Sequence, residues 1–107
     1  MGIDIQLHRA CEESAIAQRF FHPCEADYLK DKDQAAFFKV WTAKESFVKY
    51  TGDGIDDAFR HFCVVGGDEV DGAACGVDFT FIDIDPQYTA CVCRPKIGNI
   101  HLIHEQL

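Results

Sequence analysis

The first residues of the chain alternate between apolar and polar side chains. The apolar members are Ile3, Ile5 and Leu7. Asp4 and Gln6 fall between them and so lie on the opposite face of an extended segment. This period of two predicts a half-buried strand over residues 2–7 that presents polar groups on one side.

Two short helices are expected next. Residues 12–21 carry an acidic first turn, which favours a helix start, and His22-Pro23 ends the pattern. Residues 24–30 then predict a second short helix with the proline near its front, where the ring is tolerated.

The longest helical segment is residues 33–51. Asp33 can cap its first turn, and Gly52 and Gly54 stop it. At about 100° per residue, an apolar stripe runs along this helix and should face the core. Its members are Phe37, Phe38, Trp41 and Val48. Phe47 lies off the stripe and must pack elsewhere or be exposed, and Lys39 lies on the far, solvated face.

The rest of the chain reads as strands separated by turns. Strands are expected over residues 62–65, 76–84, 88–93 and 99–107, with turns at residues 66–72 and 85–86. The order of one strand, several helices and then several strands predicts an α+β fold. We expect a single domain over residues 1–107, with an antiparallel sheet packed against one long helix and additional short helices.

One carboxylate falls inside the apolar stripe of the long helix. Glu45 lies at about 40° from Trp41, with Lys44 and Lys49 at about −60° and +80° on the two flanks. A buried carboxylate is costly unless it is paired or binds a cation. Glu45 can form an ordinary helical pair with Lys49, or it can serve a functional site, and geometry alone favours the pair.

Asp4 offers a second isolated carboxylate. It can be a polar residue on the wet face of an edge strand, which is the simpler interpretation. It can also join Glu45 around Mg²⁺, which takes one or two carboxylates and keeps water and phosphate oxygens as its other ligands. Spacing in the sequence does not decide between these readings.

Charge and cysteine content narrow the classes of function. With 10 basic and 18 acidic residues the net charge is −8, which argues against nucleic-acid binding. No apolar run is long enough for a membrane helix, and the start of the chain lacks a secretory signal. We therefore expect six reduced cysteines in a cytoplasmic protein. Cys91 and Cys93, two apart in a strand, should face the same side.

Several motifs resemble the 4′-phosphopantetheinyl transferase superfamily. The run W-T-A-K-E-S-F-V-K over residues 41–49 resembles the family signature W-x-x-K-E with a further lysine four residues later. G-I-D-I at residues 2–5 resembles the second metal-binding motif. T-G-D-G-I at 51–55 resembles the turn after the signature, and D-P-Q-Y-T-A-C-V at 85–92 resembles the C-terminal strand pair.

The resemblance implies a reaction and a set of roles. A carrier-protein serine would attack the β-phosphate of coenzyme A, which transfers 4′-phosphopantetheine and releases adenosine 3′,5′-bisphosphate. Asp4 and Glu45 would bind Mg²⁺, and Glu45 would also take the serine proton. Lys44 and Lys49 would contact the phosphates of coenzyme A. Acyl or peptidyl carrier proteins of fatty acid, polyketide or peptide synthesis are the implied partners.

The chain also departs from the family pattern. Surfactin-type members usually carry G-x-D-x-E, and here the last position is Gln6, whose amide can bind a metal without adding charge. The details resemble the C-terminal half of a surfactin-type enzyme, whereas the length resembles a holo-acyl-carrier-protein synthase. Short members are trimers with sites between neighbours, so we expect a homotrimer, or alternatively a homodimer that mimics the two halves.

Two other hypotheses about function are considered beside an active transferase. One is a family member that binds coenzyme A or a carrier protein without turnover. Another is a small zinc protein using His22/Cys24, His61/Cys63 or Cys91/Cys93, although the usual C-x₂₋₄-C spacing is missing. For a transferase, the carrier protein would dock on the chain segment that links the first strand to the long helix. The apolar anchors are Phe20, Phe21, Tyr28 and Leu29, with Arg19, Lys30 and Lys32 for acidic groups, unless the two phenylalanines are core.

Overall fold

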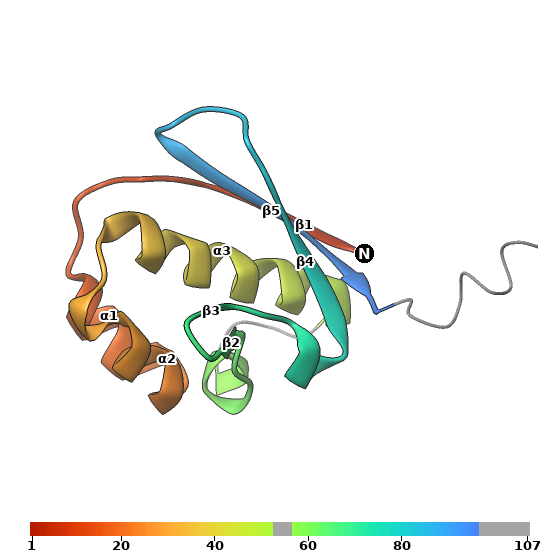
Figure 1. The fold of residues 1–107 in the computed structure, drawn as a ribbon, viewed down its shortest axis with the longest axis horizontal. Coiled ribbons are helices and arrows are strands. Elements are labelled where there is room, and N and C mark those ends of the chain that lie inside the picture. Colours follow the sequence, from red (N-terminus) through yellow and green to blue (C-terminus); the bar gives the residue numbers. More distant parts are fainter. Residues whose placement is uncertain (53–56, 97–107) are drawn as a thin grey trace, which may run out of the picture.

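The computed structural model describes residues 1–52 and 57–96, and it confirms an α+β fold with antiparallel sheets (Figure 1). The strands are β1 Gly2–Leu7, β2 Val65–Gly66, β3 Glu69–Val70, β4 Val77–Ile82 and β5 Tyr88–Pro95. The α-helices are α1 Glu13–Phe20, α2 Pro23–Tyr28 and α3 Gln34–Thr51. Three short 3₁₀ helices are η1 Leu29–Asp31, η2 Asp57–His61 and η3 Ala73–Cys75. None of the described helices has the length and apolar character required to cross a membrane.

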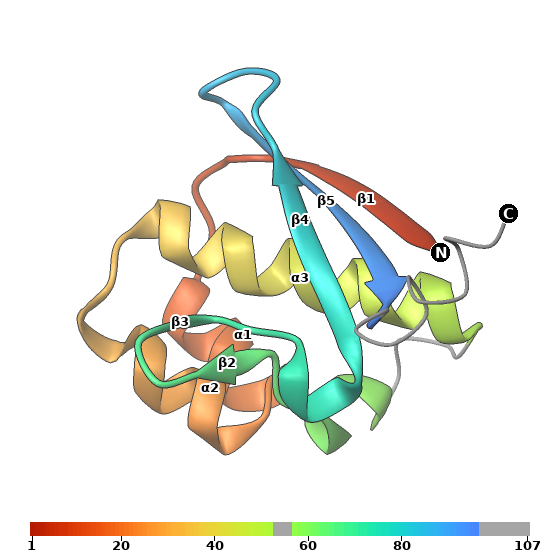
Figure 2. The ribbon, with the colours of Figure 1, turned by 45° about the vertical axis from the view of Figure 1, so that its right-hand side comes forward.

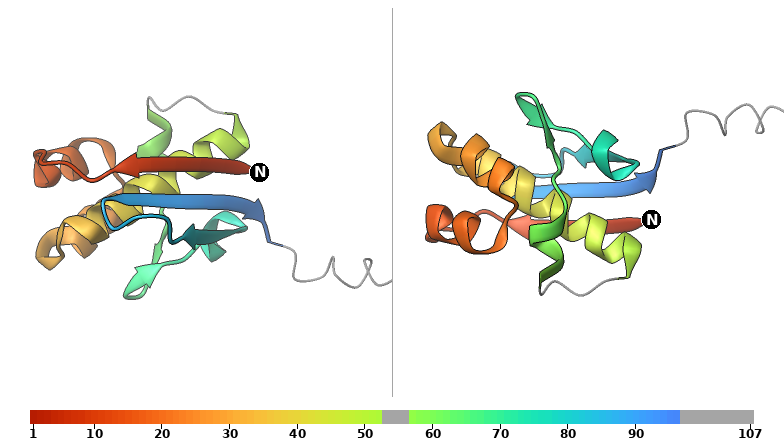
Figure 3. Two further views of the ribbon diagram at one scale, coloured as in Figure 1. Left: turned by 90° about the horizontal axis from the view of Figure 1, so that it is seen from above. Right: turned by 90° about the horizontal axis from the view of Figure 1, so that it is seen from below.

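The main sheet has three antiparallel strands in the order β1-β5-β4. The first strand of the chain therefore pairs with the last described one, and β5 lies in the centre. Asp4 is opposite Cys91 in β5, and Phe81 of β4 is opposite the same residue from the other side. Seen from above, β1 and β5 run side by side across α3 (Figure 3).

Helix α3 lies between two layers (Figures 1 and 2). The sheet covers one side, where Ser46 Oγ is 3.6 Å from Cys91 Sγ. Helices α1 and α2 and the β2–β3 hairpin lie on the other side, where the rings of Phe37 and Phe21 are 5.6 Å apart. Prediction of a single core-facing stripe was therefore incomplete, because α3 buries side chains in two directions.

The two residues placed off the stripe are now explained. Phe47 packs on Phe62, with ring centroids 4.5 Å apart, in the layer opposite the sheet. Lys39 is exposed, as predicted, and its ammonium lies 5.1 Å from the centre of the Phe81 ring in β4. The ammonium of this solvated lysine thus makes a cation–π contact with an aromatic ring at the rim of the sheet.

Strand β1 buries the face that carries its polar residues. Gly2 and Asp4 are buried against α3, whereas the apolar residues face outward. Ile3, Ile5 and Leu7 are 51%, 54% and 45% exposed. The alternation was predicted correctly, but the expectation of a wet polar face for Asp4 is wrong, because the helix covers that side of the strand.

Several predicted elements differ from the structure. Residues 62–64 are not in a strand, and only Val65–Gly66 pairs, with Glu69–Val70, so the expected turn at residues 66–72 is a small hairpin. The predicted strand at residues 99–107 lies outside the described residues. Both cysteines of β5 are fully buried on the same side, as expected.

Candidate functional site

A glycine brings β1 close enough to α3 to form the site. A Cβ atom on Gly2 would overlap the Ser46 carbonyl oxygen and lie 2.6 Å from the Tyr50 backbone nitrogen. No other residue fits without moving the strand. Because side chains alternate along a strand, Asp4 points to the same face as Gly2 and so reaches the last turns of α3.

Asp4 is the centre of the site. It is only 5% exposed, and its Oδ1 lies 2.7 Å from Lys49 Nζ. Its other oxygen, Oδ2, accepts a hydrogen bond of 2.6 Å from Gln6 Nε2. The side chain of Lys49 remains 53% exposed, so this pair opens to solvent on the lysine side.

Glu45 lies beside this pair, one helical turn before Lys49. Its Oε2 accepts a hydrogen bond of 3.3 Å from Trp41 Nε1. Burial raises the pKa of Glu45, the Trp41 bond lowers it, the nearby Asp4 carboxylate raises it further and Lys49 lowers it. The described ion pair of Lys49 is with Asp4 rather than with Glu45, so the simple helical pair is not what forms.

Lys44 points to the opposite side of α3. Its Nζ is 2.7 Å from Glu25 Oε1 and donates a hydrogen bond of 2.7 Å to the Phe62 carbonyl oxygen. Both charged side chains are completely buried, and the Phe62 ring lies 3.9 Å from the ammonium. Burial lowers the pKa of Lys44, and the Glu25 carboxylate raises it in partial compensation.

The structure therefore separates residues that the signature places together. Asp4, Glu45 and Lys49 meet on one side of α3, whereas Lys44 is enclosed on the other. A phosphate cannot reach Lys44 in this arrangement, because the ammonium is 0% exposed and already bonded. Its expected contact with coenzyme A stays a prediction, and this arrangement gives it no support.

The buried partner of Lys44, Glu25, was not predicted from the sequence. Its Oε1 accepts from the His22 backbone nitrogen and its Oε2 from the Val64 backbone nitrogen, at 2.9 and 2.7 Å. A local signal was present, since His22 and Glu25 form the N-cap and third position of a capping box on α2. That motif predicts the helix start but gives no indication of a lysine from α3.

The ligand chemistry of Asp4 and Glu45 suits a hard cation. Two carboxylates of like charge lie close enough that one raises the pKa of the other, and an amide is bonded to the first. Oxygen ligands of this kind are what Mg²⁺ takes from proteins, with the remaining positions left to water and phosphate. Lys49 supplies a half-exposed positive charge at the same place.

Comparison with known proteins identifies the family. The family model described as the 4′-phosphopantetheinyl transferase superfamily matches residues 1–93. The 4′-phosphopantetheinyl transferase psf-1 of Bacillus pumilus is 32% identical over 90% of this chain and 45% of its own length. The 4′-phosphopantetheinyl transferase HetI of a Nostoc strain is 40% identical over 51% of this chain and 25% of its own.

A third relative matches an intermediate share of this chain. The 4′-phosphopantetheinyl transferase Sfp of Bacillus subtilis is 40% identical over 60% of this chain and 30% of its own length. The chain thus spans less than half the length of the curated relatives it matches. Since the family match covers most of the sequence, the chain belongs to the 4′-phosphopantetheinyl transferase superfamily.

Proposed function

We propose that this chain carries the site that transfers 4′-phosphopantetheine from coenzyme A to a serine of an acyl or peptidyl carrier protein. The observation that carries the proposal is the meeting of Asp4, from the start of the chain, with Glu45 and Lys49 on α3. These are the residues to which the family resemblance assigns metal and phosphate contacts. The names of the matched relatives support the same reaction.

Asp4 and Glu45 are the proposed Mg²⁺ ligands, with the Gln6 amide oxygen as a further candidate. The ion, when bound, supplies positive charge against the diphosphate of coenzyme A. The chain's own contribution is to hold two oxygen ligands on rigid elements, a strand paired over six positions and an 18-residue helix. Such preorganisation avoids reorganisation of the protein during the reaction.

Lys49 is the proposed phosphate contact. Its ammonium pairs with Asp4 but its side chain is half exposed, so it can exchange a carboxylate oxygen for a phosphate oxygen. Cation binding at Asp4 would favour that exchange, because it offsets the negative charge that holds the lysine. Lys49 would then stabilise charge on the leaving phosphate.

Glu45 is the proposed base for the carrier serine, directly or through a water molecule. Burial raises its pKa from the ordinary value, which makes its carboxylate a better proton acceptor near neutral pH. The Trp41 indole fixes one carboxylate oxygen at 3.3 Å. The other oxygen remains for the cation or the proton.

A non-catalytic role is the second candidate, and one observation favours it. Both Asp4 oxygens are already bonded inside the protein, one to Lys49 and one to the Gln6 amide. A carboxylate held in this way can support the fold and a coenzyme A or carrier-protein contact without turnover. Measuring transfer directly separates this alternative from the first.

The outer face of the main sheet provides a surface for assembly. Its exposed apolar residues are Ile3, Ile5, Leu7, Ile82 and Tyr88, each between 41% and 54% exposed. A contiguous apolar face of this kind usually marks an interface. We propose that a second copy of this chain covers it, in a homotrimer or alternatively a homodimer, with coenzyme A bound between subunits. Light scattering at micromolar protein should give two or three times the chain mass.

The proposed carrier-protein surface is smaller than expected, because one of its predicted apolar anchors is buried in the core. Phe21 is core, at 2% exposed, whereas Phe20 is 42% exposed and lies beside Arg19, whose guanidinium is 5.3 Å from the ring centre. Lys30 is exposed, and among the described residues it pairs with the similarly exposed Asp27. Charge reversal at Lys30 and Lys32 should raise the apparent KM for the carrier protein and leave that for coenzyme A unchanged.

The deciding experiment is a mass shift on a panel of apo carrier proteins incubated with coenzyme A, Mg²⁺ and the chain. We place the reaction in the cytoplasm, consistent with six free cysteines. Addition of one phosphopantetheine, lost on chelation and in Asp4→Ala and Glu45→Ala, is the expected result. Near-normal transfer by either variant would refute the ligand assignment. Folded protein that binds coenzyme A but transfers nothing to any carrier would support the non-catalytic role.

A further inference from the structure

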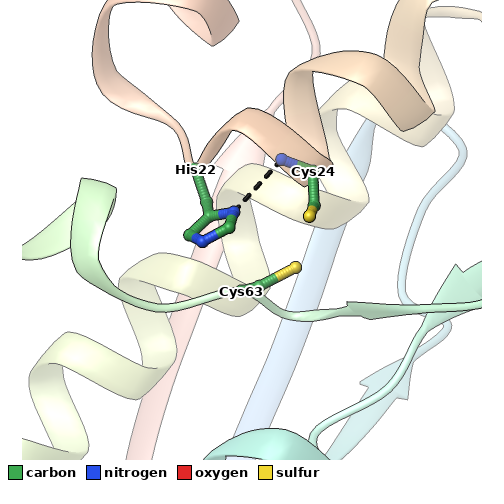
Figure 4. A group of neighbouring side chains, drawn as sticks. All are labelled: His22, Cys24 and Cys63. Carbon is green, nitrogen blue, oxygen red and sulfur yellow. Dashed lines mark hydrogen bonds between the residues drawn. The ribbon is translucent and has the colours of Figure 1, made fainter.

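Three side chains with nitrogen or sulfur ligand atoms meet between α2 and the segment that leads into β2. They are His22, the N-cap of α2, Cys24 in the first turn of that helix, and Cys63. Their ligand atoms all lie within 4.8 Å of one another, and Figure 4 shows the side chains gathered in the same space. We propose that they form a binding site for a divalent transition metal that takes nitrogen and sulfur ligands, with Zn²⁺ as the principal candidate.

The distances are close to those of a formed site. With Zn–S of about 2.3 Å and Zn–N of about 2.0 Å, the ligand atoms of a tetrahedral site are about 3.5–4 Å apart. The upper limit of 4.8 Å exceeds these separations by only about 1 Å, so small side-chain movements would bring the three atoms to ligand distances. Water can supply the fourth ligand.

The ligand chemistry separates this site from the one at Asp4. Thiolate and imidazole select zinc and related metals, whereas carboxylate and amide oxygens suit Mg²⁺. The two sites lie on opposite sides of α3, one under the sheet and one in the α2 layer. The zinc site is therefore independent of the proposed transfer reaction, and either can fail without the other.

The buried Glu25–Lys44 pair holds the ligand segments in place. Glu25 accepts hydrogen bonds from the backbone nitrogens of His22 and Val64, at 2.9 and 2.7 Å. Lys44 donates to the carbonyl oxygen of Phe62, at 2.7 Å. The backbone is thus fixed at one ligand and on both sides of Cys63, so binding requires little ordering of the chain.

Metal binding exchanges one weak local contact. In the structure His22 Nδ1 accepts a hydrogen bond of 3.1 Å from the Cys24 backbone nitrogen (Figure 4). A metal on Nδ1 replaces this bond, and a metal on Nε2 places the proton on Nδ1, which then cannot accept it. Either way the helix gives up one exposed cap bond, while the Glu25 half of the capping box remains.

The test is a Co²⁺ and Zn²⁺ titration of the reduced full chain. We expect one equivalent of Co²⁺ to give thiolate charge-transfer absorption and the visible bands of a tetrahedral site, both abolished by one equivalent of Zn²⁺. Cys24→Ser and Cys63→Ser should each weaken binding by at least about tenfold. His22→Asn should do the same, although Asn preserves a good N-cap.

The matched control is Cys11→Ser, which removes a part-buried thiol outside the group and should bind like the unmodified chain. Cys24 is exposed, so Cys24→Ser tests the site even where Cys63→Ser fails to fold. Absence of thiolate absorption, or equal binding by Cys24→Ser, would overturn the proposal. The proposal would also be overturned if the unreduced protein held a stoichiometric Cys24–Cys63 disulfide and the reduced protein bound no metal.

Discussion

Two lysine–carboxylate pairs on α3 have the same length and opposite surroundings. Lys44 Nζ is 2.7 Å from Glu25, and Lys49 Nζ is 2.7 Å from Asp4. In the first pair both side chains are 0% exposed, whereas in the second the lysine is 53% and the aspartate 5% exposed. Five residues along one helix are enough to place one pair between layers and the other at an open edge.

The difference shows that burial, rather than distance, determines what an ion pair can do. An enclosed pair cannot exchange partners, and losing one member leaves an uncompensated charge in the core. A pair with one exposed member contributes less to stability, because water competes for the charge of the exposed Lys49. It can, however, release its lysine to a ligand, which is what the proposed role of Lys49 requires.

The largest expected effect is loss of the buried lysine. Lys44→Met should destabilise the protein by about 3–5 kcal/mol, because Glu25 remains buried without its cation. Lys49→Met should change stability by less than about 1 kcal/mol while reducing phosphopantetheine transfer strongly. Urea unfolding of both variants, together with the carrier-protein mass assay, measures the contrast.

Comparable stability losses in the two lysine variants would contradict the claim that burial determines how much each ion pair stabilises the fold. Normal transfer by Lys49→Met, with the fold intact, would remove that residue from the proposed phosphate site. Lys39→Met is the matched control, since this lysine lies on the same helix, is exposed and is assigned no role in the reaction.

Gly2→Ala should have the next largest effect. The added methyl group would meet the backbone of α3 at Ser46 and Tyr50, so β1 must move away from the helix. We expect a loss of about 1–3 kcal/mol and weaker Mg²⁺ binding, because Asp4 moves with the strand. Thermal unfolding and a Mg²⁺ titration measure the two effects.

Ile3→Val is the control for this change, since it alters the neighbouring outward-facing residue by one methylene. Unchanged stability and Mg²⁺ affinity in Gly2→Ala would show that the close approach of strand and helix is not needed. A loss of stability with unchanged Mg²⁺ affinity would show that the close approach supports the fold but not the proposed metal site.

Double-variant cycles measure how strongly the two members of each lysine–carboxylate pair are coupled. Combining Glu25→Gln with Lys44→Met should recover part of the loss, with a coupling of about 1–3 kcal/mol. Combining Asp4→Asn with Lys49→Met should give a coupling below about 1 kcal/mol, because the pair is solvated on one side. Denaturant unfolding of the four single and two double variants gives both values, and equal couplings would refute the contrast.

The smallest expected effect is a loss of stability at alkaline pH, caused by the buried cysteines of β5 that face α3. Burial raises the pKa of Cys91 and of Cys93 to about 11 from an ordinary 9.0. Because the folded pKa exceeds the unfolded one, this contribution to stability is complete below pH 9 and declines as pH rises towards 11. Urea midpoints between pH 8 and 10 should fall less in Cys93→Ala than in the unmodified chain, and equal falls would exclude the Cys93 thiol as a cause.

The sequence was informative wherever a local contact defines the structure. The helix predicted over residues 33–51 begins where Asp33 Oδ1 accepts a hydrogen bond from the Ala36 nitrogen, at 3.0 Å. It ends at Gly52, whose φ of 83° suits a left-handed cap that glycine adopts at little cost. Both signals act within one turn of the helix, so no knowledge of the remaining fold was needed.

The fold class and the separation of faces were also available from the sequence. Alternation over residues 2–7 correctly grouped Asp4 with Gln6, and the β5 cysteines lie on one side as expected. The signature on α3 named Glu45 and Lys49, which the structure brings beside Asp4, although their roles in the reaction stay predictions. Periodicity establishes these groupings because it depends only on the geometry of one element.

The element that covers each face is set by tertiary packing. The polar side of β1 is buried because Gly2 lets α3 pack against it, and Lys44 is enclosed because α2 and the residues before β2 cover a second side of the helix. His22, Cys24 and Cys63 likewise meet only when two distant segments share the same buried glutamate. A sequence period shows which residues share a face, but the partner of that face is chosen by packing between elements far apart in the chain.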